Sequence, residues 1–336
     1  MKQHNVIAIS RTPPAFARIC ALMLCLMIGA APCRAACPAE TVSLYMPAPA
    51  GSQLDALYGL LPETWRAHFQ ETLNLSPFPG RGGSHAIRRL LDDEGSGCSL
   101  AAVILPSLYL LTETRDRMFN AGELHIAAVL AGAPNAVWVA EESPFRSLAD
   151  LVMHARAENE KQHGVFILAG TGSYTDQHLA SLEFDRAAGV KSRYLPVLGS
   201  AEAIQAVKDG SATACWGYAL APERMPGMRA LAVAGERRSV ALPEVPTFLE
   251  VRVDMINVTH FALAIRSDSL EEGMRRIQDG LAALMMDEVF RDRAAARGFV
   301  PLVLDRQEID AFLEDLQRDV RLRLAEYELI PRHLRR

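Results

Sequence analysis

The chain has 336 residues, of which 50% are hydrophobic and 22% charged, the composition of an ordinary globular protein. This length allows two domains of about 100–200 residues each, and no repeat or low-complexity tract indicates a solenoid or a fibre. The formal net charge is −5 and the basic residues are scattered, so nucleic-acid binding, which needs a clustered basic face, is not expected.

The first 36 residues have the order of a secretory signal peptide. Three basic residues precede an apolar run from Ile19 to Ala31, and a stretch rich in small residues follows. The run is shorter than the roughly 20 apolar residues that a membrane-spanning helix needs. We therefore expect cleavage after Ala35 or Ala36 and a periplasmic product. A retained membrane anchor and a lipoprotein modified at Cys33 or Cys37 are the alternatives.

The mature chain begins with alternating strand, loop and helix patterns. A β-rich run at Thr41–Met46 is followed by a turn and a helical pattern that extends to Phe69. A second short strand at Leu73–Ser76 is followed by a glycine-rich turn and another helix. The nearly continuous apolar run Cys98–Leu105 predicts a parallel strand that is buried on both faces.

The same pattern then restarts. Strands are predicted at Phe166–Ala169, Arg193–Pro196, Ala212–Trp216 and Arg229–Val233, and a helix at Asp176–Ala188. The alternation predicts two α/β lobes, each with a doubly wound and mostly parallel sheet. Residues 37–133 plus 258–336 form the first lobe and residues 134–257 the second. They are joined near residues 131–139 and 257–265, and two connections of this kind can hinge.

Export determines how the cysteines are interpreted. Removal of the signal peptide leaves Cys37, Cys98 and Cys215, which permits one disulfide and one thiol in an oxidising compartment. Cys215 lies in an apolar run and is expected to be a buried strand residue. Cys37 lies just before the strand that begins at Thr41, and Cys98 opens the strand that runs to Leu105. These two strands are neighbours in the doubly wound order 2-1-3. We therefore predict a Cys37–Cys98 disulfide.

Two glycine-bearing turns, one in each lobe, follow strands and open helices. They are Ala50-Gly51-Ser52 and Gly170-Thr-Gly-Ser173. Free backbone N–H groups at the start of a helix can bind an anion without a cationic side chain. The alternative interpretation is simple turn chemistry, for which glycine is common. Because both turns occupy corresponding strand ends, they predict a shared site in the cleft between the lobes. A dinucleotide site is rejected because the third glycine of its fingerprint is missing.

Enzyme motifs are absent from the sequence. There is no G-x-S-x-G, H-E-x-x-H or G-K-[ST] pattern, and the nine histidines are dispersed. Ser52 and Ser173 have no evident histidine–carboxylate partner, so a periplasmic hydrolase is only a rival hypothesis. His178, in the first turn of its helix, either lines the cleft or packs beside its own loop. We expect no catalytic residue, no metal site and no cofactor.

Four segments with distinctive motifs are spread over almost the whole mature chain. The most specific is Arg229–Glu250, which contains L-A-V, an R-S pair and L-P-x-V-P-T-x-x-E. The others are Met46–Asp55, Pro79–Ser84 and Gly170–Ala180. From about Thr41 to Ile330, their order and spacing resemble those of the substrate-binding proteins of tripartite tricarboxylate transporters, the Bug-type receptors.

The resemblance implies a two-lobed periplasmic-binding-protein fold of type II, the venus-flytrap kind, that closes on a carboxylate. Family members hold the carboxyl group with backbone amides of two glycine-bearing loops, often with ordered water. Carried over to this chain, these are the loop 48–52 with Asp55 and the loop 171–173. Gly199 matches the glycine of a further turn. The expected ligand-binding residues are Ala48, Pro49, Ala50, Gly51, Ser52, Asp55, Ser107, Thr171, Gly172, Ser173, His178 and Gly199.

The sequence departs from the family pattern at several loop positions. Ala48 replaces a phenylalanine, Ser52 replaces the second glycine, and residues 197–199 lack the lysine of the family's Y-K-G turn. Gly217 stands where the family commonly has an aspartate, and two extra residues lie within 173–178. These changes affect the pocket walls and leave the scaffold intact.

The sequence therefore predicts a receptor rather than an enzyme. We expect it to capture a small mono-, di- or tricarboxylate or an amino acid, and to deliver it to the membrane subunits of a tripartite tricarboxylate-type transporter. The alternatives are a sensor that signals without transport and, less favoured, a periplasmic hydrolase. The expected partners are the ligand and the transporter subunits or a sensor protein, and the expected state is a monomer.

Overall fold

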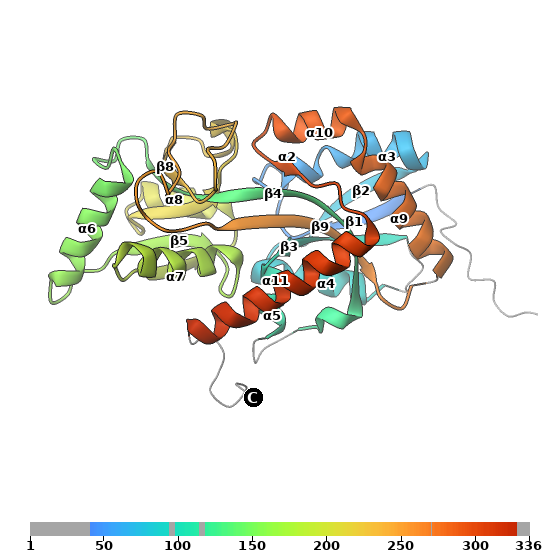
Figure 1. Cartoon of the computed structure of the whole chain (residues 1–336), viewed down its shortest axis with the longest axis horizontal. Coiled ribbons are helices and arrows are strands. Elements are labelled where there is room, and N and C mark those ends of the chain that lie inside the picture. Colours follow the sequence, from blue (N-terminus) through green and yellow to red (C-terminus); the bar gives the residue numbers. More distant parts are fainter. Residues whose placement is uncertain (1–40, 94–97, 114–117, 270, 328–336) are drawn as a thin grey trace, which may run out of the picture. The chain divides into compact units, whose positions relative to one another are not determined.

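The structure is a computed structural model that describes residues 41–93, 98–113, 118–269 and 271–327. The predicted signal peptide and Cys37 lie outside these residues. Helices and strands alternate along the described chain (Figure 1). No helix among these residues is both long and apolar enough to cross a membrane.

The first half of the fold contains three parallel strands in the order β2-β1-β3, as predicted. Its elements are β1 (Thr41–Met46), α2 (Asp55–Tyr58), α3 (Leu61–Phe69), β2 (Thr72–Pro77), α4 (Ser84–Leu91), β3 (Ser99–Leu105) and α5 (Ser107–Thr112). Successive strand residues face opposite sides of a sheet. Val42 and Leu44 therefore pack on the α3 side, whereas Tyr45 packs on the α4 and α5 side.

The second half repeats this arrangement with the order β7-β5-β6. Its elements are α6 (Leu148–Glu160), β5 (Ile167–Thr171), α7 (Asp176–Ala188), β6 (Arg193–Val197), α8 (Ser200–Lys208), β7 (Ala214–Tyr218) and β8 (Met228–Val233). Trp216 packs on the α6 and α7 side, and the neighbouring Cys215 packs on the α8 side. Both side chains are buried in a strand, as predicted from the apolar run.

Two long strands join the halves and make the sheet mixed. β4 (Leu124–Ala140) and β9 (Val258–Arg266) are antiparallel and lie side by side (Figure 1). From Leu124 to Pro134, β4 pairs with β9, and from Asn135 onwards it pairs with β7 and β8. The chain leaves the first half in β4 and returns in β9, which is why these neighbours are antiparallel. The sheet is therefore less uniformly parallel than the alternating sequence pattern suggested.

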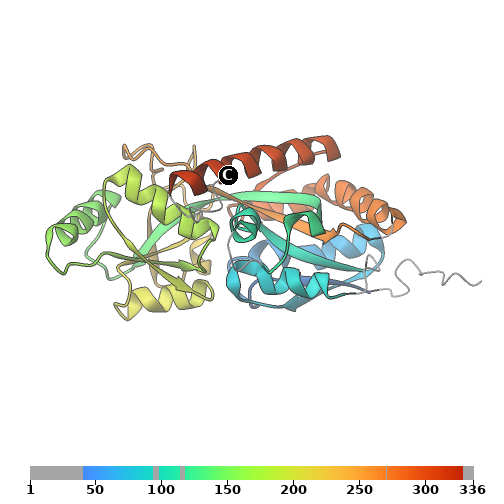
Figure 2. The same ribbon diagram turned by 90° about the horizontal axis from the view of Figure 1, so that it is seen from below.

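The chain ends in helices that cover the first half. They are α9 (Glu271–Met285), α10 (Glu288–Ala295) and, after the short strand β10 (Val300–Pro301), α11 (Arg306–Glu326). Figure 2 shows α11, in red, lying over the two long strands. Phe312 of α11 packs edge-on against His260 of β9, with ring centroids 4.9 Å apart. Arg323 near its end forms an ion pair with Glu183 of α7, so α11 connects the two halves.

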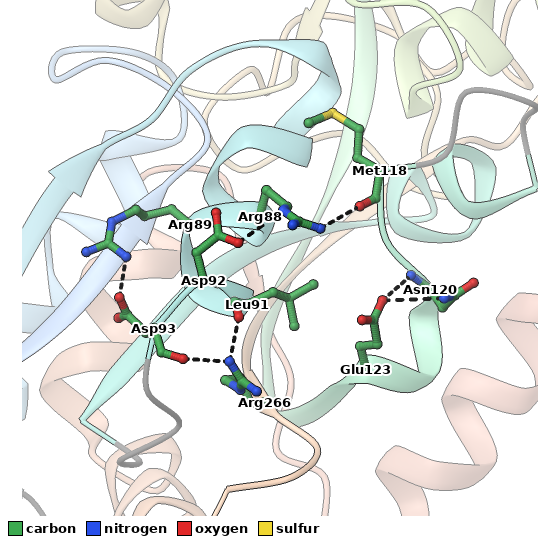
Figure 3. Close-up of polar contacts among 9 residues, drawn as sticks. All are labelled: Arg88, Arg89, Leu91, Asp92, Asp93, Met118, Asn120, Glu123 and Arg266. Carbon is green, nitrogen blue, oxygen red and sulfur yellow. Dashed lines mark hydrogen bonds and ion pairs between the residues drawn. The ribbon is translucent and has the colours of Figure 1, made fainter.

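An arginine fixes the carboxyl end of α4. The Arg266 guanidinium donates hydrogen bonds to the carbonyl oxygens of Leu91, the last residue of α4, and of Asp93, two residues further on (Figure 3). Arg89 of the same helix forms an ion pair with Asp93. Carbonyl groups at a helix end lack partners within the helix, so a guanidinium from β9 both satisfies them and anchors α4 to the sheet. The opposite, amino end of α4 begins at the cavity described next.

Candidate functional site

A cavity of about 250 Å³ lies where the loops of the two halves meet. Its walls are formed by Pro47, Ala48, Ser52, Gln53, Leu54, Gly80, Arg81, Gly82, Gly83, Ile104, Thr171, Gly172, Thr175, Asp176, Gln177, Pro196, Val197, Leu198, Gly199, Ser200 and Tyr218. The lining is mostly apolar side chains and loop backbone. Such a volume suits a ligand smaller than a drug-sized molecule.

The topology explains why these residues come together. The lining segments lie at or just after the carboxyl ends of β1, β2, β3, β5, β6 and β7. Strands β1–β3 are parallel to one another, and so are β5–β7. The carboxyl ends of parallel strands share one edge of a sheet, and ligands of open α/β folds bind in the crevice at that edge. The cavity therefore occupies this edge in both halves.

Glycines allow the loops of the two halves to touch. Gly172 has a φ of +72°, and a Cβ added there would lie 3.1 Å from Thr175 Cγ2 and 3.3 Å from the Gly82 nitrogen. Gly82 has even less space, because a Cβ there would lie 2.7 Å from the same Thr175 methyl group. Left-handed backbone and close approach both favour glycine. The Gly80–Gly83 loop, absent from the predicted site list, is thus a wall of the cavity.

Two helix amino termini open at the cavity without a side-chain cap. Gly83 precedes α4 and Gly199 precedes α8, and within the described residues neither helix receives a capping bond from a side chain. In α4 the first amide, Ser84 N–H, donates to the Arg81 carbonyl of the preceding turn. The first amides of a helix have no acceptor within it, and the helix dipole places partial positive charge there. The arrangement favours a negatively charged group between the two termini.

Four of the amides expected to hold the ligand already have acceptors within the protein. Gly51 N–H donates to Asp55 Oδ2 (3.0 Å) and Ser52 N–H to the Pro49 carbonyl (3.3 Å). In the second loop, Thr171 N–H donates to Gln177 Oε1 at 2.8 Å, and Gly172 N–H donates to the Val197 carbonyl at 2.9 Å. These bonds shape the two loops. The first turns of α4 and α8 are therefore better placed than these four amides to bind an anion.

The twelve sequence-predicted residues divide between the cavity and its supports. Those that line it are Ala48, Ser52, Thr171, Gly172 and Gly199. Those outside the lining are Pro49, Ala50, Gly51, Asp55, Ser107, Ser173 and His178. The predicted loops thus form part of the cavity wall, and seven of the twelve residues lie outside its lining.

His178 packs beside its own loop. Its Nδ1 accepts the Tyr174 N–H at 3.2 Å, and its ring stacks on Tyr194 with centroids 4.6 Å apart. Burial lowers its pKa, which favours the neutral ring that accepts this bond. Of the two interpretations of this histidine, the structure supports the packing role.

A buried carboxyl group that the sequence analysis did not single out lies at the cavity wall. Asp176, the first residue of α7, is 1% exposed. It accepts hydrogen bonds from Ser107 Oγ (2.9 Å), Thr259 Oγ1 (2.7 Å) and Tyr218 OH (3.1 Å). Burial raises its pKa, against the effect of the three hydroxyl donors. The available signal was its position in segment 173–178, which is two residues longer than the family pattern.

Gln53 connects the halves on another side of the cavity. Its side chain accepts the Tyr218 N–H at 3.1 Å and donates to the Tyr218 carbonyl at 3.3 Å, as a neighbouring strand would. A Cβ at Gly217 would lie 3.2 Å from Gln53 Oε1. The glycine at position 217, noted as a departure from the family, therefore gives Gln53 its space.

The described residues offer little for catalysis or metal binding. Ser52 Oγ accepts the Asp55 amide at 3.4 Å, and no hydrogen bond found here connects Ser52 or Ser173 to a histidine. Within the same residues, no three His, Cys, Asp or Glu side chains are grouped so that they could hold a metal ion.

Comparison with protein families identifies the class. Residues 79–323, well over half of the chain, match the model of TctC, the tripartite tricarboxylate transporter family receptor. The chain therefore belongs to this family of solute-binding receptors, which confirms the resemblance seen in the sequence.

Individual relatives agree with this assignment. The chain is 24% identical over 281 residues to a "UPF0065 protein in gbd 5'region" from Cupriavidus necator, covering 82% of this chain and 84% of that protein. R. palustris Rpa4515 with adipate has a similar structure, with a TM-score of 0.78, 19% identity and coverage of 87% and 98%. The periplasmic binding protein BugD gives a TM-score of 0.72, 18% identity and coverage of 85% and 95%. These structures confirm the two-lobed α/β fold.

Proposed function

We propose that this protein is a periplasmic receptor that binds a small carboxylate in the cavity and delivers it to the membrane subunits of a tripartite tricarboxylate-type transporter. One observation carries the proposal: the uncapped amino termini of α4 and α8 open at a single cavity. Family membership and the adipate bound to a relative of the same fold support a carboxylate as the negatively charged group.

The two helix amino termini would contribute to the free energy of carboxylate binding. Each helix dipole contributes about 0.3–1 kcal/mol to an anion in an exposed position and up to about 2 kcal/mol in a partly buried one. Charge-assisted hydrogen bonds from free amides add to this. Arg81, an exposed residue on the cavity wall, is the one basic side chain among the described lining residues. Main-chain amides and helix dipoles would therefore provide most of the interactions that hold the carboxylate.

The proposed lobes are residues 37–133 plus 258–336 and residues 134–257. The change of β4 partners between Pro134 and Asn135, and the start of β9 at Val258, support these boundaries. Since each lobe would supply part of the site, ligand would favour the closed arrangement over an open one.

We also propose that the protein is exported with a cleaved signal peptide and that Cys37 and Cys98 form a disulfide. The order of residues 1–36 and the periplasmic relative BugD support a cleaved signal peptide. The pairing of Ser43 with Ser99, and the 3.0 Å bond from Ser43 N–H to the Cys98 carbonyl, support a Cys37–Cys98 bridge. They place Cys98 beside the start of β1.

A thermal-shift screen of small mono-, di- and tricarboxylates tests the proposal, because ligand that binds only the native state raises Tm. The neutral amides of the same skeletons serve as matched controls. We expect a carboxylate, but not its amide, to raise Tm in a concentration-dependent way. A complete panel without a shift, or equal shifts for acid and amide, would contradict the proposal.

A proline substitution then tests the helix end itself. Ser200 is the first residue of α8, where proline is tolerated and removes only an unpaired N–H. Ser200→Pro should weaken carboxylate binding, and Ser200→Ala should weaken it less. Glu288→Pro makes the same change at the first residue of α10, which does not line the cavity, and should leave affinity unaltered. Equal affinities for Ser200→Pro and Glu288→Pro would exclude the α8 amide from the site.

A further inference from the structure

Asp176 differs from every other described lining residue in having a buried carboxyl group. It is the one acidic side chain among the described residues of the cavity wall, and it is 1% exposed. Its three donors are hydroxyl groups of Ser107, Thr259 and Tyr218, from α5, β9 and β7. Hydroxyl groups orient a carboxylate but do not neutralise it.

No cationic partner compensates this carboxylate within the described chain. No ion pair of the described residues involves Asp176, and the one basic lining residue, Arg81, is exposed. Two tyrosines, Tyr194 and Tyr218, interact electrostatically with Asp176. Burial raises the pKa of Asp176 and so favours its neutral form, because no cation compensates the ionised one. A cationic group in the cavity would supply the counter-charge that the ionised carboxylate needs.

The carboxylate also retains acceptor capacity. An ionised carboxyl group has about four acceptor positions, and side-chain hydroxyls occupy three of those on Asp176. One hydroxyl reaches Oδ1 and two reach Oδ2, which leaves Oδ1 able to accept another donor. The anion-binding helix ends of α4 and α8 belong to the same cavity. The cavity therefore combines a place for a negative group with a place for a positive one.

We propose that the ligand is a small amino carboxylate whose ammonium group pairs with Asp176 while its carboxylate is held at the helix ends. This inference rests on the proposed function and narrows the ligand class. Asp176 would then be a specificity-determining residue, which favours amino carboxylates over plain carboxylates of the same length.

Matched ligand pairs that differ by one ammonium group test this directly. Isothermal titration of the full mature protein with aspartate and succinate, glutamate and glutarate, and 4-aminobutyrate and butyrate compares the two classes. We expect the wild-type protein to bind the amino member of at least one pair about tenfold or more tightly than the plain member. Preference for the plain member in every pair that binds would overturn the inference. This comparison needs no variant, so it holds even where a substitution impairs folding.

Two variants assign the preference to Asp176. Asp176→Asn keeps the size and the acceptor oxygen but removes the charge, and should reduce the preference by about tenfold or more. Ser107→Ala removes a neighbouring hydroxyl without changing charge, and should affect both members of a pair equally. Unchanged preference in Asp176→Asn would overturn the assignment.

The outcomes also separate this inference from the proposed function. If plain carboxylates bind and amino carboxylates do not, only the inference fails. If neither class binds the wild-type protein at any tested concentration, the carboxylate receptor proposal fails and the inference with it.

Discussion

At Gly172 the loop after β5 lies against the backbone of Gly82. Substituting Gly172 with Val should weaken carboxylate binding by about tenfold or more, because a side chain there displaces Thr175 and the Gly82 backbone. Gly51→Val is the matched control, since Gly51 also has a positive φ, of +79°, but a Cβ there meets nothing within 4 Å. Both variants should lose about 1–2 kcal/mol of stability from backbone strain. Calorimetry and urea unfolding measure the two effects, and equal binding by both variants would contradict the role given to Gly172.

His260 makes stability depend on pH. Burial lowers its pKa to about 4, whereas an unfolded histidine titrates near 6.5. The unfolded state therefore binds more protons between these values, so stability is full above about pH 6.5 and falls by up to about 3 kcal/mol as pH decreases to about 4. His260→Leu should flatten this dependence, while His163→Gln, at an exposed position, should leave it unchanged. Urea unfolding from pH 7.5 to 4 is the measurement, and an unchanged slope in His260→Leu would refute the prediction.

At the scale of secondary-structure elements, Arg266 of β9 anchors the carboxyl end of α4. Arg266→Ala leaves the carbonyl groups of Leu91 and Asp93 without this donor and should cost about 1–3 kcal/mol of stability. Arg275→Ala removes an exposed ion pair with Glu271, 3.5 Å long, and should change stability by about 0.5 kcal/mol or less. Urea unfolding compares them. Similar losses in both variants would show that the carbonyl contacts do not anchor the helix.

The predicted disulfide would connect the starts of two neighbouring strands. A Cys37–Cys98 bridge would close a loop of about 60 residues, worth roughly 4 kcal/mol on the chain-entropy model. Peptide mapping of oxidised, exported protein should yield a linked pair of peptides and leave Cys215, which is fully buried, as the thiol. Recovery of Cys37 and Cys98 as free thiols would disprove the bridge.

Two elements with a clear local pattern were predicted to the residue, whereas several predicted strands have ends that differ by one or two residues. The strand Thr41–Met46 and the helix Asp176–Ala188 have the expected ends, because turn residues and a threonine N-cap bound them. The long strand β4 was interpreted only as a connection near residues 131–139. Its 17 residues are almost uniformly buried, so its sequence has no alternation that distinguishes a strand.

The cavity was predictable only in part, because strand pairing brings together residues that are far apart in the sequence. Its two glycine-bearing loops follow strands and were identified from sequence. Asp176 and its donors Ser107, Tyr218 and Thr259 are separated by 42 to 83 positions in the chain. Only the pairing of β7, β4 and β9 brings these segments together, and no local pattern encodes that proximity.

At the scale of the whole molecule, export should shorten the chain. Intact-mass measurement of the periplasmic product should show a new amino terminus at Ala36 or Cys37, because small residues precede the expected cut. The mass of the uncleaved chain, or an added lipid, would contradict the prediction.

The central claim is tested most directly by a structure of the mature protein in complex with one ligand. The ligand to use is the carboxylate that raises Tm most. We predict that the ligand occupies the cavity between the two halves, with carboxylate oxygens within hydrogen-bonding distance of amides in the first turn of α4 or α8. A ligand bound elsewhere, for example in the charged groove between α7 and α11, would contradict the account.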